Sequence, residues 1–310
     1  MAVYEKGEGF PVVLCHGFPE LAFSWRHQLG PLGEAGYHAI APDQRGYGLT
    51  DSPAAVEAYS LEHLCADLVG LLDAKGIDKA VFVGHDWGGG VVWRMPLAHP
   101  DRVAGVVGVN TPMGRPPGDQ PPVATLRRLR GDDNYVVAFQ EPGVADEILG
   151  ANTEKLFHRL MRRGRRTAEE FAKLPEDHPD RNFQLLRDLQ ESEGEPPGEL
   201  FLTPEELAFF VDTFERTGFT GGINWYRNID RNWEAARAAD WSYEIDVPCL
   251  YIGAADDVVL PPSSADGMES FIADLEKQTI DDCGHWTQQE KPEELNRILI
   301  DWLDRRFGAA

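Results

Sequence analysis

The sequence has few cysteines, and the four that it contains are scattered. They stand at positions 15, 65, 249 and 283 and form no CxxC pair. Cys15 and Cys249 lie in strand-like apolar runs, and Cys65 lies in a helical pattern. This usage argues against a disulfide framework and predicts buried free thiols in a reducing, cytoplasmic compartment.

Long hydrophobic runs and basic residues are also scarce. No apolar run is long enough to cross a bilayer, and Met1 leads directly into mixed polar sequence, so we expect neither a membrane span nor a signal peptide. Lys and Arg number 29 against 52 Asp and Glu, which gives a net charge of −23. Such acidity argues against nucleic-acid partners and against an anionic membrane surface. We expect a small-molecule partner, and the sequence leaves both a monomer and a homodimer open.

What is present is an alternation of short apolar runs with helical patterns, in a chain of 310 residues that can hold one large α/β domain. This alternation predicts a mainly parallel sheet with helices on both faces. We expect strands at residues 12–15, 37–41, 80–83, 103–109, 248–253 and 276–280, and helices at about 23–30, 61–75, 87–99, 262–272 and 292–307. Ser60 is a candidate N-cap and Gly76 a stop for the second helix, and Pro96 should kink the third.

The regular alternation stops at about Met113 and resumes near Ile245. The sequence between them is helical, polar and interrupted by Pro/Gly clusters. We therefore predict a helical cap at 113–245, inserted into a core formed by 1–112 and 246–310. Within this cap, the basic run from Arg162 to Arg166 is expected to be a solvated helix face and not an anion-binding site.

The segment from Val81 to Gly90 reads as an apolar strand, a glycine-rich corner and the start of a helix. This is the context of a nucleophile elbow, which is written G-x-S-x-G in serine hydrolases. The serine is missing here, and Asp86 stands in the central position between Gly84 and Gly88. If the motif has no catalytic meaning, Asp86 is only a favourable acid in the first turn of a helix.

An aspartate in this position decides the chemistry. Serine suits acyl transfer because water can cleave the resulting ester, whereas attack by serine on a saturated carbon would leave a stable ether. A carboxylate that attacks a saturated carbon leaves an alkyl ester, which water can cleave. Asp86 therefore indicates displacement at a saturated carbon, of either an epoxide or a carbon–halogen bond.

Two further segments complete a triad in the order nucleophile, acid, base. The acids Asp256 and Asp257 follow a predicted strand, at the edge where open α/β sheets meet their ligands. His285 lies on a glycine-flanked loop, and the ordinary pKa of histidine suits a general base. The sequence therefore supplies a nucleophile, an acid and a base.

The other histidines that stand near these motifs or in predicted elements are expected to be structural or solvent-exposed: His16, His27, His38, His85 and His99. A metal cluster of His16, His85, Asp43 and Asp86 can be drawn, but these residues lack paired ligand spacing on one element. We therefore expect no metal and no cofactor.

With these motifs in place, the chain resembles the epoxide hydrolases of the α/β-hydrolase superfamily, including the hydrolase domain of mammalian soluble epoxide hydrolase. The resemblance covers nearly the whole length and implies the α/β-hydrolase fold. It rests on five segments, HGFPE at 16–20, GHDWGG at 84–89, FQEPGVA at 139–145, NWYRN at 224–228 and DCGHW at 282–286. The two cap segments are the discriminating ones, because dehalogenases share the elbow and histidine loops.

The resemblance implies roles for individual residues. Two cap tyrosines that activate the epoxide oxygen map to Tyr135 and Tyr226. The acid of the triad maps to Asp256, by its spacing to Pro261, and not to the neighbouring Asp257. The family usually has one more strand before the segment that begins here at Val3, so we expect a shortened sheet edge; the phosphatase domain fused to the mammalian protein is absent.

The residues and the resemblance together predict a two-step reaction. Asp86 attacks an epoxide carbon, and His285 then activates water to cleave the ester, which yields a vicinal diol. The backbone N–H groups of Phe18 and Trp87 are the natural donors to the oxyanion, since Pro19 has no N–H.

Two other functions stay open. A haloalkane or fluoroacetate dehalogenase would bind its halide through N–H donors such as the Trp87 indole, although fluoroacetate enzymes have an Asp-Arg elbow and this chain has Asp86-Trp87. A non-catalytic binding protein on the same fold is the second alternative, because fold does not fix function. The intact set of Asp86, His285 and Asp256 argues against it.

Overall fold

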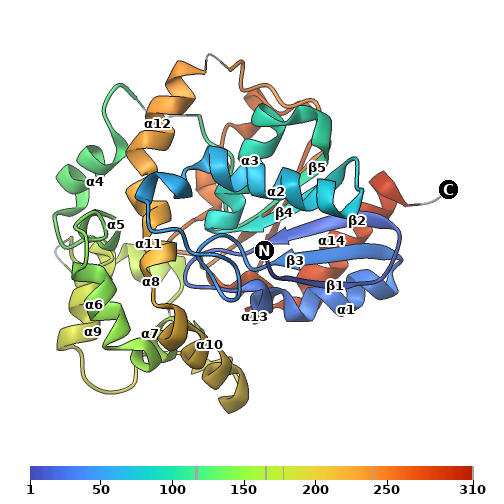
Figure 1. The fold of residues 1–310 in the computed structure, drawn as a ribbon. Coiled ribbons are helices and arrows are strands. Elements are labelled where there is room, and N and C mark those ends of the chain that lie inside the picture. The colour runs from blue at the N-terminus through green and yellow to red at the C-terminus, as the bar shows by residue number, and fades with distance from the viewer. Residues whose placement is uncertain (116–117, 165, 177, 240, 309–310) are drawn as a thin grey trace.

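The chain folds around a seven-stranded sheet (Figure 1). A computed structural model describes all residues except 116–117, 165, 177, 240 and 309–310. The strand order is β1-β3-β2-β4-β5-β8-β9, and neighbouring strands run parallel except in the β1–β3 pair. The strands are β1 (Val3–Lys6), β2 (Phe10–Cys15), β3 (Tyr37–Pro42), β4 (Ala80–His85), β5 (Val103–Val109), β8 (Cys249–Ala254) and β9 (Leu275–Ile280). The predicted strands are confirmed, and β1 adds an antiparallel edge that the sequence pattern does not predict.

Both faces of the sheet are buried, which explains the continuous apolar character of its central strands. All six residues of β4 are buried. Helices α2 (Leu61–Lys75) and α3 (Trp87–Ala98) cover one face, and α1 (Arg26–Glu34) and α14 (Pro292–Phe307) cover the other (Figure 1). Side chains of β4 accordingly alternate between two cores, with Phe82 in the first and Val81 and Val83 in the second.

The region between β8 and β9 differs from the prediction of one helix at 262–272. It contains two short 3₁₀ helices, Pro262–Ala265 and Met268–Ser270. Gly267 lies between them with a φ of 87°. A right-handed helix cannot continue through a residue in the left-handed region, so the pattern breaks into two turns.

The ends of α2 and α3 agree with the sequence only in part. Ser60 occupies the N-cap position of α2, but its hydroxyl pairs with the His63 ring at 2.8 Å and caps no backbone N–H. Gly76 ends α2 in the left-handed conformation, as predicted. Helix α3 runs through Pro96 to Ala98, and the kink at Pro96 stays a prediction.

A helical segment separates β5 from β8. Its helices are α4 (Pro122–Arg130), α5 (Tyr135–Ala138), α6 (Val144–Gly150), α7 (Thr153–Leu160), α8 (Ala168–Ala172), α9 (Leu185–Glu191), α10 (Pro204–Thr217), α11 (Thr220–Arg227) and α12 (Ile229–Ala238). Strands β6 (Arg162–Arg163) and β7 (Glu199–Leu200) form a small antiparallel ribbon within it. The segment lies to one side of the sheet (Figure 1), and it lines a cavity together with residues that follow β4, β8 and β9. It therefore covers the edge where open α/β sheets bind their ligands.

Two expectations from composition have structural counterparts. The four cysteines are free and buried, as predicted. Within the described ranges, no helix is both long enough and apolar enough to cross a membrane.

Candidate active site

The corner between β4 and α3 has the geometry of a nucleophile elbow. Asp86 adopts φ 51° and ψ −122°, a strained conformation for a residue with a side chain. The glycines on either side are required by close approach. A Cβ atom on Gly84 would lie 2.3 Å from the carbonyl oxygen of Gly88, and one on Gly88 would lie 2.1 Å from that of Cys15. The tight turn therefore presents the Asp86 carboxylate at the end of β4, as the sequence predicts.

The Asp86 carboxylate has one backbone donor and faces one imidazole. The N–H of Phe18 donates to Oδ1 at 2.9 Å. Oδ2 lies 3.7 Å from Nε2 of His285, which is close enough for an ion pair but too long for a hydrogen bond. The side chains of Asp86 and His285 are each 13% exposed. The fold thus brings Asp86 and His285 together, with Oδ2 of Asp86 facing the imidazole and Oδ1 bonded to the N–H of Phe18.

The acid that contacts His285 is Asp257, and the expectation of Asp256 in this role is wrong. Oδ2 of Asp257 lies 2.9 Å from Nδ1 of His285, and the Asp257 side chain has no exposed surface. Asp256 points instead toward the helical segment, where Oδ1 accepts the N–H of Ala168 at 3.0 Å. The physical reason is a turn after β8, closed by the N–H of Asp257 on the carbonyl of Ala254 at 3.1 Å, which sends adjacent side chains in different directions.

Asp257 is held by donors on three sides. Its Oδ1 accepts the N–H groups of Val259 at 2.8 Å and Leu260 at 3.0 Å, and its Oδ2 accepts from the Asn110 amide at 2.7 Å. Asn110 follows β5 and has a φ of 61°, a conformation that asparagine tolerates better than most residues. Sequence reasoning missed Asn110, although a polar residue directly after an apolar strand is a usable signal.

The two partners of the imidazole–carboxylate pair shift each other's pKa. Burial lowers the pKa of His285, but the charges of Asp257, Asp86 and Glu20 raise it to a net value of about 9. Burial raises the pKa of Asp257, and the charge and hydrogen bond of His285 outweigh it, so that the pKa is about 2. The resting site therefore stabilises an imidazolium between two carboxylates.

Tyr135 and Tyr226 line the same cavity as Asp86. Tyr135 is the first residue of α5 and Tyr226 lies in α11, and their ring centroids are 5.6 Å apart. Tyr226 also contacts the rings of Trp87 at 5.1 Å and Phe18 at 5.3 Å. Burial, and with it the charge of Asp86, raises the pKa of both phenols above the ordinary value, so both are protonated donors at neutral pH.

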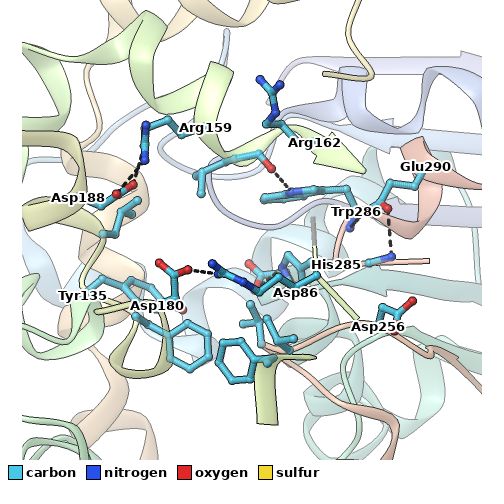
Figure 2. Close-up of a pocket in the computed structure, with 18 of the residues that line it drawn as sticks. Asp86, Tyr135, Arg159, Arg162, Asp180, Asp188, Asp256, His285, Trp286 and Glu290 are labelled. Carbon is cyan, nitrogen blue, oxygen red and sulfur yellow. Dashed lines mark hydrogen bonds and ion pairs between the residues drawn. The ribbon is translucent and has the colours of Figure 1, made fainter. Parts of the chain in front are cut away.

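The cavity has a volume of about 400 Å³ and reaches from Asp86 and His285 to the helical segment (Figure 2). Charged pairs of that segment lie along it. Arg159 binds Asp188 with two hydrogen bonds of 2.5 and 2.8 Å, and a second arginine pairs with Asp180. The cavity is therefore lined on one side by Asp86 and His285 and on the other by arginines that are paired with aspartates.

The basic run of the helical segment corrects another expectation. Arg162 lies in β6 with a side chain only 9% exposed, and both it and Arg166 line the cavity. Arg166 is the partner of Asp180. The predicted solvated helix face is wrong for these two residues, because neither lies in a helix and both line the cavity; Arg165 lies outside the described residues.

A buried polar group behind the triad was also missed by sequence reasoning. The Glu20 carboxylate has no exposed surface and lies 2.9 Å from Nδ1 of His85, whose Nε2 donates to the backbone carbonyl of His285 at 2.6 Å. Gln288 and Gln289 donate to the other Glu20 oxygen. Burial raises the pKa of Glu20, but the charge of His85 outweighs it and the pKa is about 2. Glu20 lies in the HGFPE segment and His85 directly precedes Asp86, and this closeness to the reactive residues in the sequence was the available signal.

His85 is thus a structural histidine, as predicted, and so is His16. The His16 ring is fully buried and bonds to the carbonyl of Gly17 at 2.9 Å and to the N–H of Gln44 at 3.1 Å. In the part of the chain that the structure describes, no three His, Cys, Asp or Glu side chains are grouped so as to hold a metal ion.

Comparison with known proteins gives consistent matches. Residues 11–292 match the family described as the alpha/beta hydrolase fold. The chain is 44% identical to epoxide hydrolase A of Mycobacterium tuberculosis, over 98% of this chain and 94% of that protein. It is 41% identical to bifunctional epoxide hydrolase 2 of Rattus norvegicus, over 96% of this chain but only 52% of that longer protein.

Solved structures resemble the chain over almost its full length. The structure of epoxide hydrolase A from Mycobacterium thermoresistibile matches with a TM-score of 0.83 and 43% identity, covering 97% of this chain and 93% of that chain. Epoxide hydrolase VrEH1 from Vigna radiata matches with a TM-score of 0.84 and 33% identity, covering 98% and 93%. Sequence and structure thus point to the same relatives.

Proposed function

The chain belongs to the epoxide hydrolases of the α/β-hydrolase family, which convert an epoxide to a vicinal diol, and we propose that it does so through a covalent ester on Asp86. The observation that carries this mechanism is an elbow aspartate that faces His285 at 3.7 Å inside a cavity lined by Tyr135 and Tyr226. A carboxylate nucleophile, a base and two acids are therefore within one site.

In the first step, Asp86 attacks an epoxide carbon and opens the ring. The oxygen leaves as an alkoxide, which is a poor leaving group unless it is stabilised or protonated. Tyr135 and Tyr226 supply this help as protonated phenols, since burial raises the pKa of both. The imidazole of His285 lies 3.7 Å from one oxygen of Asp86, and the N–H of Phe18 orients the other oxygen.

In the second step, His285 removes a proton from water, which attacks the carbonyl carbon of the ester. Asp257 holds the imidazole and stabilises its charged form. Ester formation prepares this step, because it removes the negative charge of Asp86 that helps to raise the pKa of His285 to about 9. The imidazole then becomes neutral more readily and is available as a base.

The oxyanion that forms in the second step needs donors. The N–H of Phe18 already points at Oδ1 of Asp86 at 2.9 Å. Trp87 begins α3, and the first N–H groups of a helix have no partner within the helix. We propose these two N–H groups as the oxyanion hole, since Phe18 lines the cavity and Trp87 directly follows Asp86 in the elbow.

We further propose that residues 113–245 form a cap and that 1–112 and 246–310 form the core. The position of the helical segment between β5 and β8, and its contribution of one cavity wall, support this division. A small-molecule epoxide is the partner that the cavity volume of about 400 Å³ supports. Four buried free thiols and a net charge of −23 support a cytoplasmic protein without nucleic-acid partners.

The mechanism is tested by a single turnover in water labelled with heavy oxygen. The first diol released should carry an unlabelled oxygen that comes from Asp86, and later turnovers should carry the label. If the oxygen added to the first diol instead carries the label, water attacks the epoxide directly. Parallel assays with styrene oxide and a bromoalkane separate this function from that of a dehalogenase, since only the epoxide should be turned over.

A further inference from the structure

The carboxylate of Glu290 bridges the two peptide groups that flank His285. Its Oε2 accepts the N–H of Gly284 at 3.0 Å, and its Oε1 accepts the N–H of Trp286 at 2.9 Å. Glu290 ends the short helix α13 (Thr287–Glu290) and is only 6% exposed. Figure 2 shows it beside the loop that carries His285. Both oxygens are therefore committed to the backbone on either side of the base.

The loop is built closely around this carboxylate. A Cβ atom on Gly284 would lie 2.9 Å from Oε1 of Glu290, so a side chain at that position would displace the carboxylate. Among the described residues, no lysine or arginine forms an ion pair with Glu290. The charge of His285 acts on Glu290, and so does the charge of Arg163 in β6. The bridge therefore couples the loop backbone and a buried negative charge to the same residue.

We propose that Glu290 is a positioning residue for the hydrolysis step, which fixes the His285 loop through both N–H groups and stabilises the imidazolium that forms there. The inference rests on the proposed function, in which His285 takes a proton from water. Alkylation of Asp86 needs no base and so does not depend on this bridge. The role of Glu290 is thus confined to one of the two steps.

Several charged groups face His285, and Glu290 acts together with them. Asp257 and Asp86 each lie beside one ring nitrogen of His285. The buried Glu20 pairs with His85, and its charge also raises the pKa of His285. Burial raises the pKa of Glu290, and the charge of His285 opposes that rise; this attraction is mutual and so favours the imidazolium. When Asp86 becomes a neutral ester, fewer negative charges remain, and the share carried by Glu290 increases.

The test compares Glu290→Gln with Glu293→Gln, a matched control at an exposed position in the first turn of α14. Alkylation is followed by quenching of tryptophan fluorescence on rapid mixing with styrene oxide, and ester hydrolysis is followed in the same traces. For Glu290→Gln we expect alkylation within about twofold of the unmutated protein and hydrolysis slower by about 10- to 100-fold, the range for losing a hydrogen bond to a charged group. The midpoint of the pH profile for hydrolysis should move to lower pH, because the imidazolium loses a stabilising charge. Glu293→Gln should change neither rate.

A second variant, Glu290→Asp, separates the bridge from the charge. The shorter side chain cannot reach both N–H groups but keeps the charge, so hydrolysis should slow while the pH midpoint stays in place. Equal losses in alkylation and hydrolysis, or an unchanged hydrolysis rate and midpoint in Glu290→Gln, would overturn the proposal; if Glu290→Gln does not fold, the ratio of the two rates in Glu290→Asp decides. Failure of the unmutated protein to form any ester would instead overturn the proposed function.

Discussion

The sheet and the helical segment hold their shares of the site by different means. The residues at the strand ends, Asp86, Asp257 and His285, are fixed by a strained elbow, by buried backbone N–H donors and by one another. Tyr135 and Tyr226 on the helical segment are held by aromatic edges. In the proposed mechanism, the ester is therefore formed and cleaved on residues held by hydrogen bonds, whereas the two tyrosines proposed to act on the leaving oxygen are held by ring contacts. Substitutions in the two regions should therefore affect different steps.

The largest expected effect is the loss of the base. His285→Gln should still be alkylated, but hydrolysis of the ester should fall by up to about 10⁶-fold, the order seen when the base of a catalytic triad is removed. Intact-protein mass spectrometry after mixing with epoxide should show the adduct on the variant. His38→Gln serves as the control, because His38 lies at the start of β3 and is not among the residues that line the cavity. Normal steady turnover by His285→Gln would exclude His285 from the mechanism.

The next effect distinguishes two acids that are adjacent in the sequence. Asp257→Asn should reduce turnover by about 10⁴-fold, since an amide cannot hold the imidazole in the correct tautomer or balance its charge. Asp256→Asn should reduce turnover by less than about tenfold, because Asp256 accepts only the N–H of Ala168 in the helical segment. Steady-state kinetics on the two variants decide between them. Equal losses would return Asp256 to the triad.

A smaller effect is expected for each tyrosine of the helical segment. Tyr135→Phe and Tyr226→Phe should each slow alkylation by about 10²–10³-fold, the usual loss for one oxyanion-type donor. The double variant should lose ring opening almost completely, while hydrolysis of an ester formed beforehand should be unchanged. Tyr37→Phe, whose hydroxyl bonds to Asp304 on α14, is the control. Alkylation of the double variant at the unmutated rate would show that both tyrosines only pack.

The smallest effect is on stability, and it concerns only His285 and Asp257 at the strand ends. The pKa of His285 rises in the fold from 6.5 to about 9, so its contribution is complete below about pH 6.5 and is lost as pH rises through 9. The pKa of Asp257 falls from 3.8 to about 2, so its contribution is present above about pH 4 and is lost as pH falls through 2. Thermal unfolding should show the highest melting temperature between these limits. In His285→Gln the decline on the alkaline side should be shallower by a few degrees, and an unchanged profile would contradict the pairing.

The strands and the reactive motifs could be predicted because their signals are local. The elbow is defined within ten residues by an apolar run, a glycine corner and a central aspartate. His285 can be identified as a candidate base because it lies on a glycine-flanked loop. The choice between Asp256 and Asp257 could not be made this way, because it depends on how a turn after β8 directs two neighbouring side chains. Their identical chemistry removes any help from residue type.

The helical segment was predicted in extent but not in detail. Arg162 lines the cavity from β6, and β6 pairs with β7 through a contact between residues 36 positions apart that no local pattern encodes. Glu290 was missed for another reason. Its partners are backbone N–H groups, and such partners leave no mark on the sequence. A side chain that bonds only to the backbone can therefore be found from the sequence only where it lies within a known motif.

The turn that separates Asp256 from Asp257 also restricts how such a protein can change during evolution. One peptide bond joins the side chain that grips the base to the side chain that anchors α8 across the cavity. A single insertion or deletion in this loop would displace both side chains at once, so we expect the proposed catalysis and the contact with α8 to constrain the length of the loop together.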